Sequence, residues 1–321
     1  MHMKNNFFKV LREGTHTSFQ DTGFQNVQHI GITTGGAMDY ELLILSNKIL
    51  GNKIHTSVIE FSSQGPLLKL VNGSCRFVIT GNVMFNIITK NKKIIGTTNQ
   101  SYLINKGDEV DILATIKSNY GYISVEGGFS IDSQFGSFST LSIAKIGSNN
   151  GNVFNKNQKI FFNKDGSTKK SKINFTNDYL NDNKIIRVIP GPQMNFFFSK
   201  TIKKFYERSF TISKYINRMG IQLEGNLCKS VISKNIISEG IIKGSIQITG
   251  SGNPIILMND HPTIGGYPKI AIVIMADLCK ISQMKVGNKF NFQEVSLIEA
   301  EIIYLKYLEN LKKKYNNINV K

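Results

Sequence analysis

The stretch Asn259-Asp260-His261-Pro262-Thr263-Ile264-Gly265-Gly266-Tyr267-Pro268-Lys269-Ile270 lies between two short apolar runs, at residues 255–258 and 271–275. Short β-branched runs bounded by glycine and proline favour strands over helices, so we expect two buried strands joined by this loop. The loop gathers a carboxylate, an imidazole, a hydroxyl and an ammonium group. Loops held by a rigid β scaffold often carry catalytic or binding groups. This stretch therefore predicts a β fold with a functional loop.

Short strands and glycine-rich turns continue through the rest of the chain. Hairpins are predicted at residues 83–95 and 102–113, and another in the second half at residues 244–258. Helical periodicity is confined to about residues 39–50, about residues 196–206 and the C-terminal tail. This pattern predicts barrels or sandwiches and not a parallel doubly wound sheet.

The length of 321 residues suits two domains of ordinary size. Short sequence echoes recur at a nearly constant spacing, among them Met38 with Met219 and Gly107 with Gly287, which favours two copies of one domain. Asn, Lys, Ser and Asp dominate residues 147–184, which predicts a linker. We expect a first half at 1–181 that includes this linker, a second half at 182–300, and a basic C-terminal helix at 301–321.

The formal net charge of +17 raises the question of a nucleic-acid partner. Proteins that bind nucleic acids cluster Lys and Arg into a stripe, whereas the lysines here are scattered and only five arginines occur. The densest basic cluster, Lys312-Lys313-Lys314, ends a segment with apolar residues at helical spacing, namely Ile302, Leu305, Leu308 and Leu311. Lysines at that end complement the helix dipole. We expect a solvated helix, with neither nucleic acid nor membrane as partner.

No apolar stretch approaches the roughly 20 residues that span a bilayer, and the N-terminal residues lack the apolar core of a secretory signal. We expect a cytoplasmic protein. The three cysteines, Cys75, Cys228 and Cys279, are odd in number and widely spaced. This argues against a disulfide framework and a zinc site, so we expect reduced core thiols and no metal.

Two carboxylates are the candidates of the first half. Asp39 follows Gly35-Gly36 at a predicted helix start, where it is either the N-cap or a ligand-facing group. The same helix N-terminus is a potential anion site. Glu60 lies in an apolar strand, where an unpaired charge is costly; it pairs with Arg12 or Lys69, or it faces a binding site.

Three polar residues of the second half are candidates for substrate binding. Gln193 follows the stiff turn Pro190-Gly191-Pro192, and Glu239 repeats the situation of Glu60. Arg218 has the planar fork that binds two oxygens of a carboxylate or phosphate. The alternative for Arg218 is a structural pair with Glu224 or Glu239.

The loop quoted above supplies the catalytic candidates. Asp260 or His261 is the candidate acid-base group, and Lys269 the candidate stabiliser of a developing oxyanion. Thr263 and Tyr267 are added as substrate-binding residues because they lie on the same Gly-Gly loop. We hypothesise that Arg218, Asp260, His261 and Lys269 line one cleft of the second half.

The loop resembles a known family together with three further motifs, Gly35-Gly36-Ala37-Met38-Asp39, Pro190-Gly191-Pro192-Gln193 and Asn217-Arg218-Met219-Gly220. From about residue 10 to about residue 300 the chain is similar to the C subunit of the ATP-dependent 5-oxoprolinase complex. This family is also called allophanate hydrolase subunit 2, or biotin-dependent carboxyltransferase-like. The resemblance implies two tandem cyclophilin-like β-barrel domains with a few short helices.

The resemblance also implies a function as a hydrolase subunit in a hetero-oligomer. With A-like and B-like subunits, such a complex opens 5-oxo-L-proline to L-glutamate and hydrolyses ATP; whether this chain itself binds the nucleotide stays open. One alternative is the carboxyltransferase of urea carboxylase, which moves a carboxyl group from carboxybiotin to urea or a similar amide, and only there is biotin a cofactor. Another is a regulatory protein that binds a B-like partner. Departures from the family pattern at Gly23-Phe24-Gln25 and at Phe138 leave the substrate open.

Overall fold

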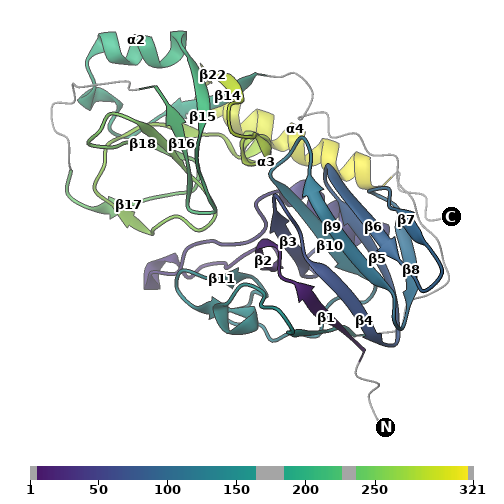
Figure 1. Cartoon of the computed structure of the whole chain (residues 1–321). Coiled ribbons are helices and arrows are strands. Elements are labelled where there is room, and N and C mark those ends of the chain that lie inside the picture. Colours follow the sequence, from purple (N-terminus) through teal and green to yellow (C-terminus); the bar gives the residue numbers. More distant parts are fainter. Residues whose placement is uncertain (1–5, 164–183, 226–235, 317–321) are drawn as a thin grey trace. The chain divides into compact units, whose positions relative to one another are not determined.

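The computed structural model describes residues 6–163, 184–225 and 236–316 (Figure 1). The chain divides into two compact units. The first comprises the described parts of Met1–Gln25, Gly35–Asp178 and Lys313–Lys321, and the second comprises Asn26–Thr34 and the described part of Tyr179–Lys312. The predicted boundary near residue 182 lies outside the described residues, so it stays a prediction.

The first unit contains two antiparallel sheets whose apolar faces share one core. The six-stranded sheet has the order β13 (Lys159–Phe161), β1 (Phe7–Arg12), β4 (Leu67–Asn72), β9 (Glu109–Thr115), β6 (Val83–Ile88) and β7 (Lys93–Ile95). The five-stranded sheet has the order β2 (Thr15–Gln20), β3 (Val58–Ser62), β10 (Tyr120–Val125), β5 (Ser74–Thr80) and β8 (Ser101–Asn105). The alternating burial of β1 and β4 shows that one face of each strand enters the core.

Helix α1 (Tyr40–Ile49) covers β10 and β5 in this unit, which explains why every residue of β10 is buried. A short ribbon of β11 (Thr140–Leu141) and β12 (Ile146–Gly147) completes the unit together with the 3-10 turn η2 (Ser148–Gly151).

The second unit is a closed seven-stranded barrel. Its order is β14 (Ile185–Pro190), β21 (Lys269–Val273), β18 (Ser245–Ile248), β19 (Pro254–Leu257), β16 (Gly220–Glu224), β15 (Ser209–Ile216) and β22 (Lys289–Glu294). Only the pairing of β14 with β22 is parallel among the ladders of this barrel that the structure describes. A separate ribbon pairs β17 (Glu239–Gly240) with β20 (Ile264–Gly265).

Short helices accompany the barrel, namely α2 (Ser199–Glu207), α3 (Leu278–Gln283) and the 3-10 turns η1 (Gln28–Ile30), η4 (Met194–Phe196) and η5 (Met275–Asp277). Phe205 of α2 stacks on Phe292 of β22, with ring centroids 4.7 Å apart, beside the buried Phe210 and Phe290. This aromatic cluster fixes α2 on the barrel. The prediction of a mainly β fold is confirmed.

The C-terminal helix α4 (Leu297–Asn316) begins earlier than residue 301. Ser296 and Glu299 form a capping box, because the Ser296 amide donates to Glu299 and the Glu299 amide donates to the Ser296 hydroxyl. Leu311 is buried and Lys312 is exposed as expected, whereas Ile302 and Leu305 are 60% and 66% exposed. Within the described residues, no helix has both the length and the apolar character to cross a membrane. Cys75 and Cys279 are buried and form no disulfide among the described residues, and Cys228 lies outside those residues.

Candidate functional site

Lys269 is the centre of the first polar cluster in the barrel unit. Its ammonium group donates to the Glu239 carboxylate. The Gln193 side chain joins both partners, because its amide nitrogen donates to Glu239 across 2.6 Å and its oxygen accepts from the Lys269 backbone amide across 3.2 Å. Three residues predicted from separate motifs therefore meet. We call Gln193, Glu239 and Lys269 the lysine cluster.

The two charges of the lysine cluster differ in their exposure to solvent. The side chain of Lys269 is 4% exposed, whereas that of Glu239 is 43% exposed. Hydrogen bonds from Lys269 and Gln193 lower the pKa of Glu239, so this carboxylate is ionised at neutral pH. In the lysine cluster a buried ammonium group is thus paired with a carboxylate that is partly open to solvent.

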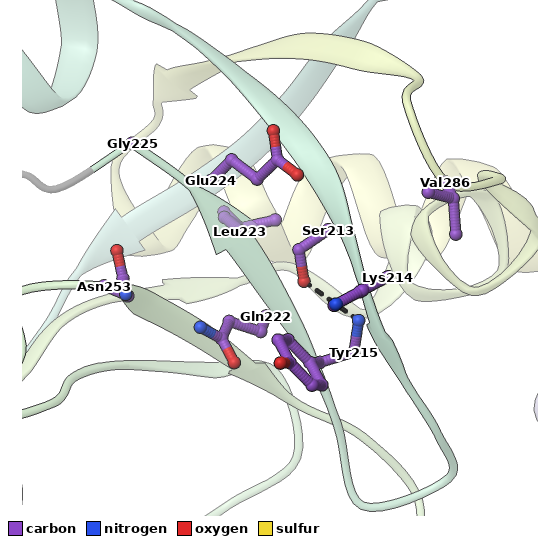
Figure 2. A pocket seen from close by; sticks show the side chains of 9 residues that line it. All are labelled: Ser213, Lys214, Tyr215, Gln222, Leu223, Glu224, Gly225, Asn253 and Val286. Atoms are coloured by element: carbon purple, nitrogen blue, oxygen red, sulfur yellow. Dashed lines mark hydrogen bonds between the residues drawn. The ribbon is translucent and has the colours of Figure 1, made fainter.

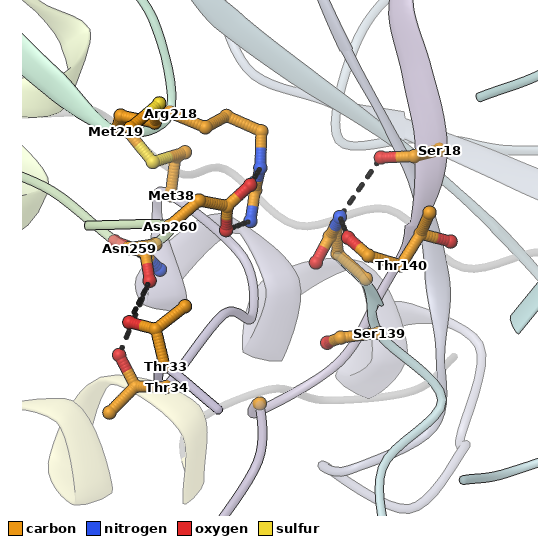
Figure 3. A network of polar contacts seen from close by, with 12 residues as sticks. Ser18, Thr33, Thr34, Met38, Ser139, Thr140, Arg218, Met219, Asn259 and Asp260 are labelled. Atoms are coloured by element: carbon orange, nitrogen blue, oxygen red, sulfur yellow. Dashed lines mark hydrogen bonds and ion pairs between the residues drawn. The ribbon is translucent and has the colours of Figure 1, made fainter. Parts of the chain in front are cut away.

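Arg218 and Asp260 form a second cluster. The guanidinium Nε and Nη2 donate to the two Asp260 oxygens, each across 2.8 Å, in a bidentate pair (Figure 3). The side chains are 11% and 5% exposed. The carboxylate that pairs with Arg218 in the structure is thus Asp260, along the Nε–Nη2 edge of the guanidinium, and not the expected Glu224 or Glu239. We call this pair the arginine cluster.

The carbonyl of Asn259, next to Asp260, is held by a distant segment of the same unit. It accepts from the hydroxyls of Thr33 and Thr34 across 3.3 and 3.4 Å (Figure 3). The Asp260 amide donates to the Arg218 carbonyl across 2.8 Å. Backbone and side chain together thus fix the start of the loop.

His261 follows the arginine cluster and is 1% exposed. Its Nδ1 lies 2.6 Å from the Pro262 carbonyl oxygen. Burial lowers the pKa of His261, and the nearby charge of Lys243 acts in the same direction, against the Pro262 hydrogen bond and Asp260. The ring is therefore neutral at pH 7. Because a carbonyl oxygen only accepts, Nδ1 carries the proton and Nε2 is an acceptor.

The strand register separates the two clusters. Lys269 pairs with Gln247 near the end of β18, whereas Ser245 at the start of β18 pairs with Ile272. β19 ends at that start of β18, and the chain then enters Asn259 and Asp260. The loop thus runs from one end of these strands to the other. The register places Arg218, Asp260 and His261 at the other end of these strands from Lys269, and the hypothesis that all four line one cleft stays a prediction.

Thr263 and Tyr267 contribute backbone groups. The Thr263 carbonyl accepts from the Ile241 amide across 3.0 Å, and the Tyr267 carbonyl accepts from the Gln247 side chain across 3.5 Å. Tyr267 is 39% exposed. Their predicted role in substrate binding stays a prediction.

In the first unit, Asp39 and Glu60 meet at the start of α1. Asp39 is the N-cap, since its carboxylate accepts from the Leu42 amide across 3.1 Å. Glu60 is 1% exposed and accepts from the Met38 amide across 2.7 Å and from the Tyr122 hydroxyl across 2.8 Å. The Tyr122 hydroxyl in turn accepts from the Asp39 amide. The carboxylates of Asp39 and Glu60 therefore lie at the N-terminus of α1 and take the place of the anion expected there.

The proposed partners of Glu60 are wrong. Arg12 pairs with Asp111 at 2.8 Å, and Lys69 pairs with Glu109 at 3.0 Å. Burial, followed by the charges of Glu60 and Asp39, raises the pKa of Tyr122 well above its ordinary value. Tyr122 therefore stays protonated and donates to Glu60.

Tyr122→Phe is expected to lower the free energy of unfolding by about 1–3 kcal/mol, because two buried hydrogen bonds lose their shared partner. Urea denaturation followed by circular dichroism measures the change. Tyr102→Phe is a control, since that hydroxyl accepts from the Thr97 amide in an exposed position. Equal stability of the Tyr122 variant and the wild type would contradict this account.

Several polar residues with buried contacts lie outside the predicted site residues. Asp21 is buried and accepts from the hydroxyls of Ser137 and Ser139, each across 2.6 Å, and from the Phe138 amide across 2.7 Å. Tyr122 was missed because an aromatic residue in a buried strand has no distinguishing pattern. Lys243 was missed because it is one of many scattered lysines. In the described residues, no three His, Cys, Asp or Glu side chains converge as a metal site would require.

A pocket of about 320 Å³ also lies outside the predicted site (Figure 2). It is lined by residues of β15 and β16 and by three residues beyond them, Gly225, Asn253 and Val286. The Ser213 hydroxyl accepts from the Tyr215 amide across 3.1 Å at its edge. None of the predicted site residues lines this pocket.

The chain is similar to known proteins over most of its own length. It is 28% identical over 316 residues to the 5-oxoprolinase C subunit of Escherichia coli (strain K12), covering 97% of this chain and 99% of that protein. It is 30% identical to the protein of the same name from Haemophilus influenzae (strain ATCC 51907 / DSM 11121 / KW20 / Rd), covering 95% and 97%. The urea amidolyase of Lachancea kluyveri is 26% identical over 90% of this chain, but this covers 17% of that protein.

The fold of the chain is also found in a solved structure. The urea carboxylase structure from Kluyveromyces lactis matches with a TM-score of 0.84 at 24% identity, over all of this chain and 30% of that one. The family model described as carboxyltransferase domain, subdomain A and B, matches residues 30–294, which contain both clusters. The chain therefore belongs to the carboxyltransferase domain family of subdomains A and B, the family that includes proteins named as the C subunit of 5-oxoprolinase.

Proposed function

We propose that this chain is a subunit of an ATP-hydrolysing 5-oxoprolinase. Together with A-like and B-like subunits, the complex opens 5-oxo-L-proline to L-glutamate. The observation that carries this proposal is the coverage of the comparisons. The relatives named as 5-oxoprolinase C subunits are matched over 97–99% of their length, whereas the urea amidolyases are matched over 17–18%.

The lysine cluster suits a ring-opening hydrolysis. Attack on a lactam carbonyl develops negative charge on its oxygen, and a cation held in place stabilises that charge more than water does. Lys269 is buried and oriented by Glu239, which Gln193 orients in turn. The partners complete the reaction, and ATP is consumed by the assembled complex.

The isolated chain is expected to show no turnover of 5-oxoproline, and the chain reconstituted with A-like and B-like subunits is expected to be active. An assay that couples ADP release to glutamate formation measures both. Omitting each subunit in turn gives the controls. Robust turnover by the isolated chain would contradict the assignment as a subunit, and an inactive complete complex would contradict the reaction.

Carboxyl transfer from carboxybiotin to urea is the second candidate, and the 26% identity to urea amidolyase favours it. An assay for the transfer of the carboxyl group from carboxybiotin to urea distinguishes this candidate from 5-oxoproline hydrolysis. The transfer should depend on urea and should not require ATP. A chain that binds a B-like partner tightly while neither reaction occurs would instead be a regulatory protein.

A further inference from the structure

The Nε2 atom of His261 is one of the buried polar atoms in the described part of the barrel unit that lack a hydrogen-bond partner. The Nε2 of His261 is buried and makes no hydrogen bond with any residue that the structure describes. Because Nδ1 donates to the Pro262 carbonyl, Nε2 keeps its lone pair and needs a donor. An unpaired buried acceptor is costly, so such atoms in folded proteins are generally satisfied by a ligand or by water.

Lys243 lies at the same end of the strands. The next residue, Gly244, donates to the Leu257 carbonyl across 2.8 Å and accepts from the Val273 amide across 2.8 Å, so Lys243 stands beside the end of β19. His261 follows that end by a tight turn, in which its amide donates to the Met258 carbonyl across 3.1 Å. Within the described residues, Lys243 makes neither a hydrogen bond nor an ion pair.

The two side chains are complementary in a specific way. His261 offers an acceptor without charge, and Lys243 offers donors with a positive charge. The electrostatic influence of Lys243 reaches both His261 and Arg218, which is consistent with their common location. A ligand that satisfies both must carry a donor and an acceptor side by side.

We propose that His261 and Lys243 bind a cis-amide edge, with the ligand N–H on Nε2 and the ligand carbonyl oxygen on the Lys243 ammonium group. In a five-membered lactam the ring holds N–H and C=O on the same side, and urea presents the same edge. Identification of the ligand as 5-oxoproline rests on the proposed function, and this contact then holds a lactam at a second position, because Lys269, the group proposed for the reacting carbonyl, leaves the other end of the strands. The pairing itself requires only an amide or a ureido group.

The test compares 5-oxo-L-proline with its lactone analogue, 5-oxotetrahydrofuran-2-carboxylate, which keeps the carbonyl and carboxylate but replaces N–H by oxygen. Calorimetry is carried out with the full chain and with the reconstituted complex without ATP. We expect the wild type to bind the lactam at least about tenfold more tightly, because the lactone leaves Nε2 unpaired. Equal affinities, or no binding of either compound to either preparation, would overturn the proposal.

Two variants separate the two contacts. His261→Phe is expected to remove the preference for the lactam by weakening lactam binding alone. Lys243→Met is expected to weaken lactam and lactone equally by about tenfold, since both ligands carry the carbonyl. His55→Phe, at an exposed histidine, is the matched control and keeps the wild-type preference. A preference retained by folded His261→Phe protein would overturn the role of Nε2.

A measurement on the wild type covers the case in which the variants fail to fold. The ¹⁵N signals of the His261 ring should show a protonated Nδ1 and a bare Nε2, and the lactam alone should shift the Nε2 signal. An identical response to the lactone would contradict the proposal. If the complex turns over 5-oxoproline but binds lactam and lactone equally, this inference alone is refuted. If the lactam is preferred but no ATP-dependent turnover occurs, the proposed function alone is refuted.

Discussion

Replacing Asp260 by alanine is expected to lower the free energy of unfolding by about 3–5 kcal/mol, because the buried guanidinium of Arg218 loses both carboxylate oxygens. Urea denaturation measures the loss. For the same reason the replacement of Arg218 should also change stability, whether or not it binds a ligand.

A double-mutant cycle tests the origin of this effect. The variant Arg218→Met/Asp260→Leu is expected to be more stable than the sum of its single changes predicts, because neither charge of the ion pair is left buried without the other. Glu207→Ala is the surface control: its pair with Lys203 spans 3.7 Å with side chains 62% and 74% exposed, and such helical pairs contribute about 0.5 kcal/mol or less. If Asp260→Ala cost no more than Glu207→Ala, the arginine cluster would not stabilise the barrel.

Lys269→Met is expected to reduce kcat of the reconstituted complex by about a hundredfold, because loss of one preorganised electrostatic donor costs roughly 3 kcal/mol in the transition state. The methionine fills the space of the buried stem. Glu239 is 43% exposed, so water can solvate its carboxylate in the variant and the change in stability should be small.

Steady-state kinetics and thermal melting of the same preparations separate catalysis from folding. Lys289→Met changes an exposed lysine of β22 in the same way and should leave kcat unaltered. Full activity of the Lys269 variant would show that the lysine cluster is structural. A loss of activity that follows unfolding or failure to bind the partners would lead to the same conclusion.

The elements with a clear period were predictable. Helix α1 begins at Tyr40, behind the predicted cap Asp39, and α2 lies within one to three residues of the expected segment. Helix α3 was missed because all six of its residues are buried, which leaves no amphipathic pattern to detect. The repeat argument fails for Met38 and Met219, since the first precedes a helix and the second lies in the turn between β15 and β16.

The residues of the lysine cluster were among those predicted from the sequence, but their pairing was not predicted. Gln193, Glu239 and Lys269 were each found through local turn or burial arguments, yet their union depends on the barrel closing. Glu60 was correctly suspected as a costly charge, but its partners are a backbone amide and the hydroxyl of Tyr122, 62 residues away. Because these partners carry no charge, a search of the sequence for oppositely charged residues could not find them.

The segment Asn26–Thr34 belongs to the barrel unit although it is translated with the first unit. Thr33 and Thr34 meet their acceptor, Asn259, across 226 and 225 residues of chain. At about 5–20 residues per second, a ribosome needs roughly 10–45 s to make that stretch. The segment must therefore wait for its acceptor while the first unit can already fold. The barrel unit is thus completed by a segment that is synthesised near the start of the chain. A gene split between the two units would separate this segment from the rest of the barrel.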